Sequence, residues 1–245
     1  VEEVLCHCFG LQSVDRAIPC SPDPEEIAKI ALESDPDFGK KRTFGVATKR
    51  SGAKGEWGSQ DFSAEVGHHM LEGDGKLSVN LGNPDFPVRV ILTKQQAWLL
   101  AEKINCPGGL PIGVQGLVLA KISNEADMLN AWQLMRRGCR VVVQEHSDEG
   151  LLAILAAWDS TITDAKKALH SRSGPGRARG EIWGRIGDTV VVDEVKEGKN
   201  TPSSLLEPMC GWTTSEMTAL GKHIRNPTTA MRPSYDNDLL TSWIA

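Results

Sequence analysis

The sequence predicts an α/β fold whose second half is built on a parallel sheet. Two apolar runs of strand length, residues 117–122 and 139–143, flank residues 128–135, whose apolar side chains recur at helical spacing. Gly138 stands where this helix would end. A strand, a helix and a second strand in this order are typical of parallel sheets, and the loop after the first strand is their usual phosphate site.

The first half also mixes helices and strands. Prolines and carboxylates within residues 21–26 predict the start of a helix that continues to about Ser34. Next comes a strand in which Phe44 and Val46 face one way, and then a helix after Ser59. That helix buries Phe62, Val66 and Met70, and short strands follow it over residues 77–81, 86–92 and 97–104.

Beyond residue 143 the sequence predicts more helices than strands. Helices are expected over residues 149–158 and 164–170, a strand over residues 189–195, and a last helix after a capping box at Thr213 and Glu216. Residues 171–180 form a loop whose arginines, Arg172, Arg177 and Arg179, either touch a phosphate backbone or belong to a solvated linker.

Composition limits the classes of function. The chain of 245 residues is 40% hydrophobic and 24% charged, as in an ordinary globular protein of one or two domains. Its formal net charge of -5 means that any RNA contact must come from a local basic patch. No apolar run approaches the roughly 18 residues of a membrane span, and no signal peptide opens the chain, so we expect a cytoplasmic protein without membrane contact.

The six cysteines form no C-x-x-C pair, which favours reduced thiols over a disulfide framework. Cys6, His7 and Cys8 could hold a metal together with a distant ligand. Strand alternation, however, would point His7 away from both thiols, and so we predict no metal site.

The densest basic cluster lies between residues 40 and 54. Its members include the five candidate RNA-binding residues Lys41, Arg42, Lys49, Arg50 and Lys54. Such a cluster is either a footprint for phosphate groups or a solvated charged face.

The order of elements over residues 20–115, with KRTFGVATKR near one end and GGLPIG at the other, resembles a THUMP domain. THUMP domains bind tRNA, chiefly at the acceptor end, so the resemblance implies an RNA-binding role for Lys49, Arg50 and Lys54. Residues 1–19 resemble the last strand of an N-terminal ferredoxin-like domain whose earlier part is missing.

The second half, residues 116–245, resembles the ATP-pyrophosphatase (PP-loop) domain of the tRNA 4-thiouridine synthetases, also called tRNA sulfurtransferases. The resemblance rests on GGLPIGVQG, SNEADM and LMRRGCRV, and the family's loop reads Ser-Gly-Gly-x-Asp-Ser. Here Ser123 and Asp127 match that motif, whereas Asn124 and Glu125 replace its glycines. A Cβ and a carboxylate at the place of pyrophosphate oxygens predict a degenerate, Rossmann-like domain without bound ATP or Mg, the cofactors of active members.

Active members also use a cysteine after the last helix, because a thiolate is the attacking species. In this chain Asp236 follows Tyr235 at that place, and Arg185 replaces the glutamine of the family's GE-x-x-GQV segment. We therefore assign no catalytic residue. Residues 206–209 match the strand that leads into the family's last helix.

Three functions remain open. The first is a catalytically inactive tRNA-binding protein that works with a separate sulfurtransferase or a cysteine desulfurase. The second is a divergent but active sulfurtransferase that uses Cys210 or a partner's thiol. The third, least favoured, is a small-molecule enzyme that uses the cleft near Ser123 and Asp127.

Overall fold

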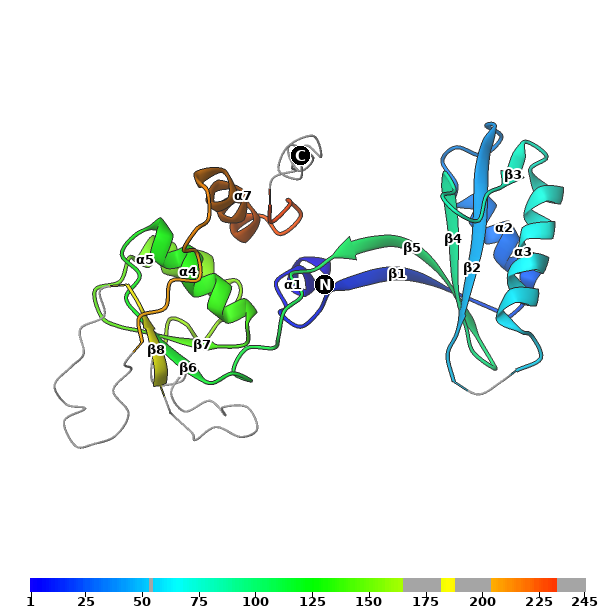
Figure 1. Ribbon diagram of the computed structural model, residues 1–245. Helices are drawn as coiled ribbons and strands as arrows, with labels where there is room; N and C mark the ends of the chain where they lie inside the picture. The colour runs from blue at the N-terminus through cyan, green and yellow to red at the C-terminus, as the bar shows by residue number, and fades with distance from the viewer. Residues whose placement is uncertain (53–54, 165–181, 188–203, 233–245) are drawn as a thin grey trace, which may run out of the picture. The chain divides into compact units, whose positions relative to one another are not determined.

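The computed structural model describes residues 1–52, 55–164, 182–187 and 204–232. The chain divides into two compact units, which we describe separately (Figure 1). Unit A is residues 15–104, and unit B combines residues 1–14 with residues 105–245.

Unit A is a five-stranded sheet with two helices. Its strands are β1 (Ser13–Cys20), β2 (Arg42–Arg50), β3 (Leu77–Val79), β4 (Phe86–Leu92) and β5 (Ala97–Asn105), in the spatial order β1-β5-β4-β2-β3. Strand β2 pairs in parallel with β3 and β4, whereas β4 and β5 are antiparallel. Its helices are α2 (Pro24–Glu33) and α3 (Ser59–Gly73), which pack against each other beside β2 (Figure 1).

The predicted elements of unit A follow from local signals. Asp23 caps α2 by accepting a hydrogen bond from the Glu25 amide, and Pro24 occupies the first turn. Phe44 on β2 is 1% exposed, and Val46 packs at the edge of the same core. This core also contains the three buried residues expected on α3, namely Phe62, Val66 and Met70. The helix and strand predictions for unit A are confirmed.

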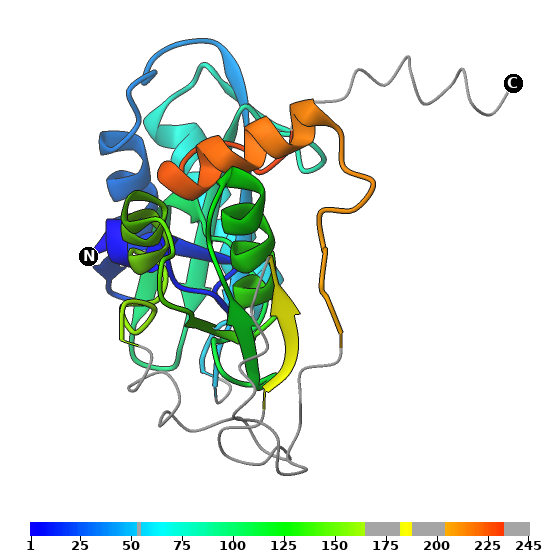
Figure 2. The same ribbon diagram turned by 90° about the vertical axis from the view of Figure 1, so that its left-hand side faces the viewer.

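Unit B contains a parallel three-stranded sheet in the order β7-β6-β8. Its strands are β6 (Leu117–Ala120), β7 (Arg140–Val143) and β8 (Ile182–Ile186), and its described helices are α1 (Glu2–Cys6), α4 (Glu125–Arg136), α5 (Glu149–Ala156) and α7 (Thr214–Arg225). Figure 2 shows α4 beside the sheet with α7 next to it. The predicted α/β fold with a parallel sheet is confirmed.

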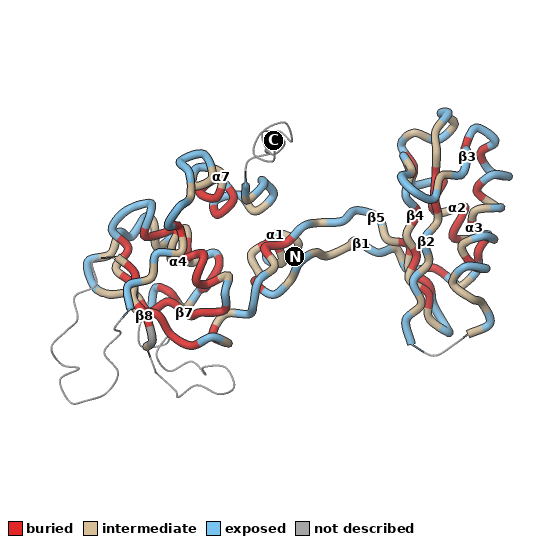
Figure 3. Tube along the Cα trace, in the orientation of Figure 1, coloured by how far each residue is buried: buried red, intermediate tan, exposed pale blue. Residues whose placement is uncertain are grey.

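Helix α4 is the centre of the unit B core. Trp132 on α4 is fully buried and makes edge contacts with Phe9 and Trp158. Gly138 ends the helix region at a φ of 92°, where a Cβ would lie 2.6 Å from Val114. Figure 3 shows that much of the α4 backbone belongs to buried residues.

Two expectations for unit B were wrong. Residues 2–6 form helix α1, whereas we expected a strand; the first strand begins at Ser13. Residues 206–209 form no strand: there is a single bridge at Leu205, followed by a turn. The helix expected over residues 164–170, the loop over residues 171–180 and the strand over residues 189–195 fall almost entirely outside the described residues.

None of the helices in the described ranges is long and apolar enough to cross a membrane. The compact units divide near residues 14 and 104, whereas the predicted domain boundaries lie at residues 19 and 115. The assignment of the first residues to a ferredoxin-like remnant stays a prediction.

Candidate functional site

The predicted nucleotide loop lies at the carboxyl end of β6, the central strand of the parallel sheet. The chain passes from β6 through α4 to β7 on one side, and β8 lies on the other side of β6. Ligands of open α/β sheets bind at this point, where the strand order reverses. The fold therefore places Ser123 and Asn124 at the position where a nucleotide site is expected.

Hydrogen bonds to side chains of the loop itself fix its conformation. The carboxylate of Asp127 accepts a hydrogen bond from the Ser123 amide at 2.9 Å, and the Asn124 side chain accepts one from the Asp127 amide at 3.0 Å. The two residues that match the family motif, Ser123 and Asp127, are thus bonded to each other. Ser147, which follows β7, accepts a further hydrogen bond from the Ile122 amide at 3.0 Å. These amides are occupied without any ligand.

Gly187, just after β8, packs closely against the loop from the neighbouring strand. Its φ is 64°, and a Cβ added there would lie 2.6 Å from the Lys121 carbonyl oxygen and 3.1 Å from Asp127 Oδ1. Only glycine fits such a position without strain. Gly187 could not be recognised from the sequence, because no strand was predicted over residues 182–186.

Glu125, the carboxylate that we expected to repel phosphate, forms a bidentate ion pair with Arg225 on α7. The two nitrogen–oxygen distances are 2.7 and 2.8 Å. Arg225 lowers the pKa of the Glu125 carboxyl, chiefly through this hydrogen bond, and Glu125 raises the pKa of Arg225 in return. The negative charge at this position is therefore largely neutralised within the protein, which the sequence analysis did not anticipate.

The pair borders a cavity of about 460 Å³ between α4 and α7. Leu129 and Met217 give this cavity an apolar side, while Lys222 adds a second cation beside Arg225. The only signal for Arg225 in the sequence was a basic residue in the last turn of a predicted helix.

In unit A the predicted basic cluster is divided by strand β2. Lys41 precedes the strand and Lys49 lies near its end, so eight residues of extended chain, roughly 26 Å, separate them. Both are exposed. The two lysines therefore lie at opposite ends of β2 and not side by side.

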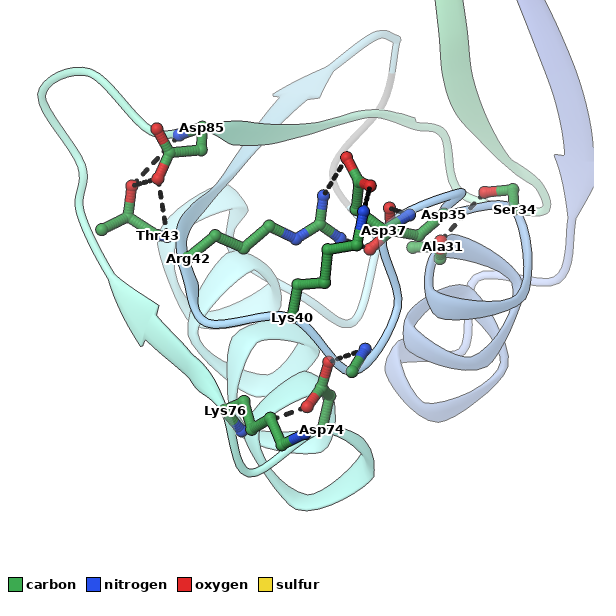
Figure 4. A network of polar contacts seen from close by, with 11 residues as sticks. Ala31, Ser34, Asp35, Asp37, Lys40, Arg42, Thr43, Asp74, Lys76 and Asp85 are labelled. Carbon is green, nitrogen blue, oxygen red and sulfur yellow. Dashed lines mark hydrogen bonds and ion pairs between the residues drawn. The ribbon is translucent and has the colours of Figure 1, made fainter.

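Arg42 differs from the exposed lysines because it is a buried structural residue. Its side chain is 12% exposed and forms an ion pair with Asp35, whose side chain is 1% exposed (Figure 4). A second carboxylate, that of Asp37, lies 3.9 Å away, and the guanidinium stacks over the Phe86 ring at 4.7 Å. The charge of Arg42 is thus used inside unit A, which corrects its grouping with the solvent-facing cations.

Arg50 lies at the end of β2, opposite Leu92 of β4. A Cβ on Gly55 would lie 3.6 Å from Arg50 Nη1 and 3.4 Å from the Cα of Lys94, which places the exposed Lys94 beside this end of the strand. The two terminal nitrogens of Arg50 are buried and have no hydrogen-bond partner within the described part of the chain. Sequence spacing could not reveal Lys94, because the β4–β5 turn brings it there.

Several predicted residues fall outside the described ranges. They are Lys54 of the basic cluster, the loop arginines Arg172, Arg177 and Arg179, and Tyr235 and Asp236 near the end of the chain.

The six cysteines form no disulfide, and Cys210, in the turn before α7, is exposed. Cys6 ends a helix, so the strand alternation used to separate His7 from the thiols does not apply. Among the described residues, no group of three or more metal-binding side chains could hold a metal ion.

Comparison with known proteins identifies two kinds of relative. The THUMP domain family matches residues 23–102. A probable tRNA sulfurtransferase of Methanocaldococcus jannaschii is 36% identical over 147 residues, which cover 58% of this chain and 38% of that protein. One of Bacillus subtilis is 33% identical over 139 residues, covering 56% and 35%.

Two solved structures share the fold. PH1313 from Pyrococcus horikoshii superposes with a TM-score of 0.65 at 20% identity and covers 91% of this chain and 80% of that one. A 4-thiouridine synthetase crystallised with RNA and bound ATP gives a TM-score of 0.63 at 18% identity, covering 98% and 79%. The chain spans little more than a third of the curated relatives it matches. Residues 23–102 thus match the THUMP domain family, and the curated proteins that the chain resembles are named probable tRNA sulfurtransferases.

Proposed function

We propose that this protein binds tRNA through unit A and does not itself catalyse thiolation, so that a separate sulfurtransferase or a cysteine desulfurase supplies the chemistry. The observation that carries the proposal is the internal pairing of the nucleotide loop. The Asp127 carboxylate accepts a hydrogen bond from the Ser123 amide, and Glu125 forms an ion pair with Arg225. The groups that would contact a pyrophosphate therefore already have partners.

The RNA-binding part of the proposal rests on the end of β2. Lys49 is exposed there, the exposed Lys94 lies close by, and Arg50 lies between β2 and this turn with its terminal nitrogens buried and unpartnered among the described residues. Lysine and arginine side chains are the usual ligands of phosphate oxygens in nucleic acids. The names of the relatives point to tRNA as the nucleic acid.

Removing this cluster tests the RNA-binding role. The variant Lys49→Ala, Arg50→Ala and Lys54→Ala should weaken tRNA binding and reduce the slope of log affinity against log salt by roughly 0.7 to 0.9 for each lost phosphate contact. The measurement is tRNA affinity at several salt concentrations.

A matched control is Lys29→Ala, Lys76→Ala and Lys103→Ala, which removes three exposed cations outside the candidate cluster. The control should change the affinity less than the variant that lacks the cluster does. Equal affinity and equal salt slope in the variant that lacks the cluster and the wild type would contradict the assignment.

A second candidate function is a divergent but active sulfurtransferase, which the exposed thiol of Cys210 favours. Incubation of the purified protein with tRNA, Mg-ATP and a sulfur donor should give no thiouridine under our proposal. Thiouridine formed by the wild type but lost in Cys210→Ser would establish the second candidate instead.

A further inference from the structure

Unit B brings three cysteines together from two distant parts of the chain. Cys6 ends α1, Cys8 follows in the next turn, and Cys106 comes directly after β5. The main chain holds the two segments side by side, because the Cys106 amide donates to the Gln12 carbonyl at 2.9 Å and the Gly108 amide to the Leu11 carbonyl at 2.7 Å.

Two of the three side chains, those of Cys6 and Cys106, are in contact, and the three differ in exposure. Cys6 is 5% exposed and Cys106 is 8% exposed, and their side chains are hydrogen-bonded to each other. Burial raises the pKa of the Cys106 thiol, and the neighbouring Cys6 and Cys8 add to this effect. Cys8 is only half-buried, and its thiol donates a hydrogen bond to the Val4 carbonyl at 3.3 Å.

We propose that Cys6, Cys8 and Cys106 form a thiol–disulfide exchange site, at which a small-molecule disulfide converts the Cys6 and Cys106 thiols into a disulfide. Cys8 is the thiol that the reagent reaches first, because it is the most accessible of the three.

The exchange needs no further oxidant. The Cys8 thiolate attacks one sulfur of the small disulfide, and the displaced sulfur leaves as a thiolate that takes up a proton. Cys106 then attacks the mixed disulfide at the Cys8 sulfur and releases the second small thiol. Finally, Cys6 attacks the Cys106 sulfur and regenerates the Cys8 thiol. In total one small disulfide is reduced to two thiols while two protein thiols become one disulfide.

The positions of Cys6 and Cys106 in the chain determine how a disulfide between them would affect stability. Unit A, residues 15–104, lies entirely between Cys6 and Cys106 in the sequence. The disulfide would therefore close a loop that contains all of unit A. Cross-links that close long loops restrict the unfolded chain most, and so the oxidised protein should unfold at a higher temperature.

The test uses the full chain in its folded state. The reduced protein is incubated with oxidised glutathione, the remaining thiols are blocked with N-ethylmaleimide, and tryptic peptides are analysed by mass spectrometry. We expect a disulfide between the peptide of residues 1–16 and the peptide of residues 104–121. We also expect a rise of several degrees in the unfolding temperature that dithiothreitol reverses.

Variants separate the roles of the three thiols. Cys106→Ser should abolish the cross-link and the rise in unfolding temperature. Cys8→Ser should retain the product but form it at least about tenfold more slowly, because the exposed entry thiol is missing. Cys6→Ser should reduce the cross-link, and Cys210→Ser, at an exposed site, should leave it unchanged.

Cys210 also shows that the reagent is active, because it should become a mixed disulfide in the wild type. Modification of Cys210 with no link between the two peptides would overturn the proposal, and this result needs no variant to fold. A cross-link that survives in Cys6→Ser and disappears in Cys8→Ser would overturn the assignment of Cys6.

Discussion

The end of β2 in unit A and the β6–α4 loop in unit B use their charged residues in opposite ways. At the end of β2, Lys49 and Lys94 are exposed to solvent, while the terminal nitrogens of Arg50 are buried without a partner among the described residues. In the loop, Glu125 pairs with Arg225 and Asp127 accepts a hydrogen bond from Ser123. A loop whose polar groups are paired internally gains less from a ligand than a strand end whose lysines face solvent.

Within unit A, Arg42 differs from the exposed lysines at the end of β2, because its charge is paired and buried. Arg42→Ala would leave Asp35 buried without its partner, and we expect a loss of about 3–5 kcal/mol in the free energy of unfolding. Chemical denaturation measures this effect. Lys40→Ala is the control: it removes the exposed Lys40–Asp37 pair and should cost no more than about 1 kcal/mol. Similar losses for both variants would show that Arg42 has no special structural role.

In unit B, restoring the two glycines of the family motif should leave the loop with an unpaired cation, as at the end of β2. Asn124→Gly with Glu125→Gly removes the carboxylate and releases Arg225, so nucleotide binding should appear. At a hundredfold excess over the dissociation constant, Mg-ATP would stabilise this variant by about 2.7 kcal/mol, measured as a rise in unfolding temperature.

The wild type should show no such rise, and Glu125→Gln alone serves as the control that keeps Asn124. Thiolation should still need Asp236→Cys in addition. A rise in the wild type with millimolar ATP would mean that the paired loop binds nucleotide after all.

A substitution at Gly187 tests how much its close packing against the loop contributes to stability. Gly187→Ala places a Cβ against the Lys121 carbonyl and Asp127 at a positive φ, and we expect a loss of about 1–3 kcal/mol in the free energy of unfolding. Gly211 has a similar φ of 84° but no atom within 4 Å of an added Cβ, so Gly211→Ala isolates the backbone strain. Equal losses for the two variants would rule out the close approach of Gly187 to the loop as a source of stability.

The smallest effect concerns the exposed Glu125–Arg225 pair itself. Glu125→Gln should lower the free energy of unfolding at pH 7 by less than about 1 kcal/mol, because the side chains are 49% and 43% exposed. Arg225 lowers the pKa of Glu125 from its ordinary value of 4.5. The pair therefore stabilises the fold above that pH, and the stabilisation is lost as the pH falls through the lowered pKa.

The measurement is the difference in unfolding free energy between wild type and Glu125→Gln at several pH values. The difference should shrink as the pH falls below the ordinary pKa of 4.5. A difference that stays constant into acid would show that the ion pair does not contribute.

Elements with strong local signals could be predicted from the sequence. The capping box of Thr213 and Glu216 starts α7 as expected, and Gly138 follows α4 at a positive φ. These predictions succeeded because a helix end depends on residues within one turn of it. Residues 2–6 were mistaken for a strand because a short apolar stretch fits either structure.

The sequence by itself determined the α/β fold, the parallel strands on either side of α4 and the positions of Ser123 and Asp127 at the end of β6. Hydrophobic spacing and caps are local, and they encode these features directly. Only the tertiary structure decided which charges are available, because ion pairs join residues that are distant in the chain. Glu125 meets Arg225 a hundred positions later, and Lys94 joins Arg50 through the pairing of β2 with β4.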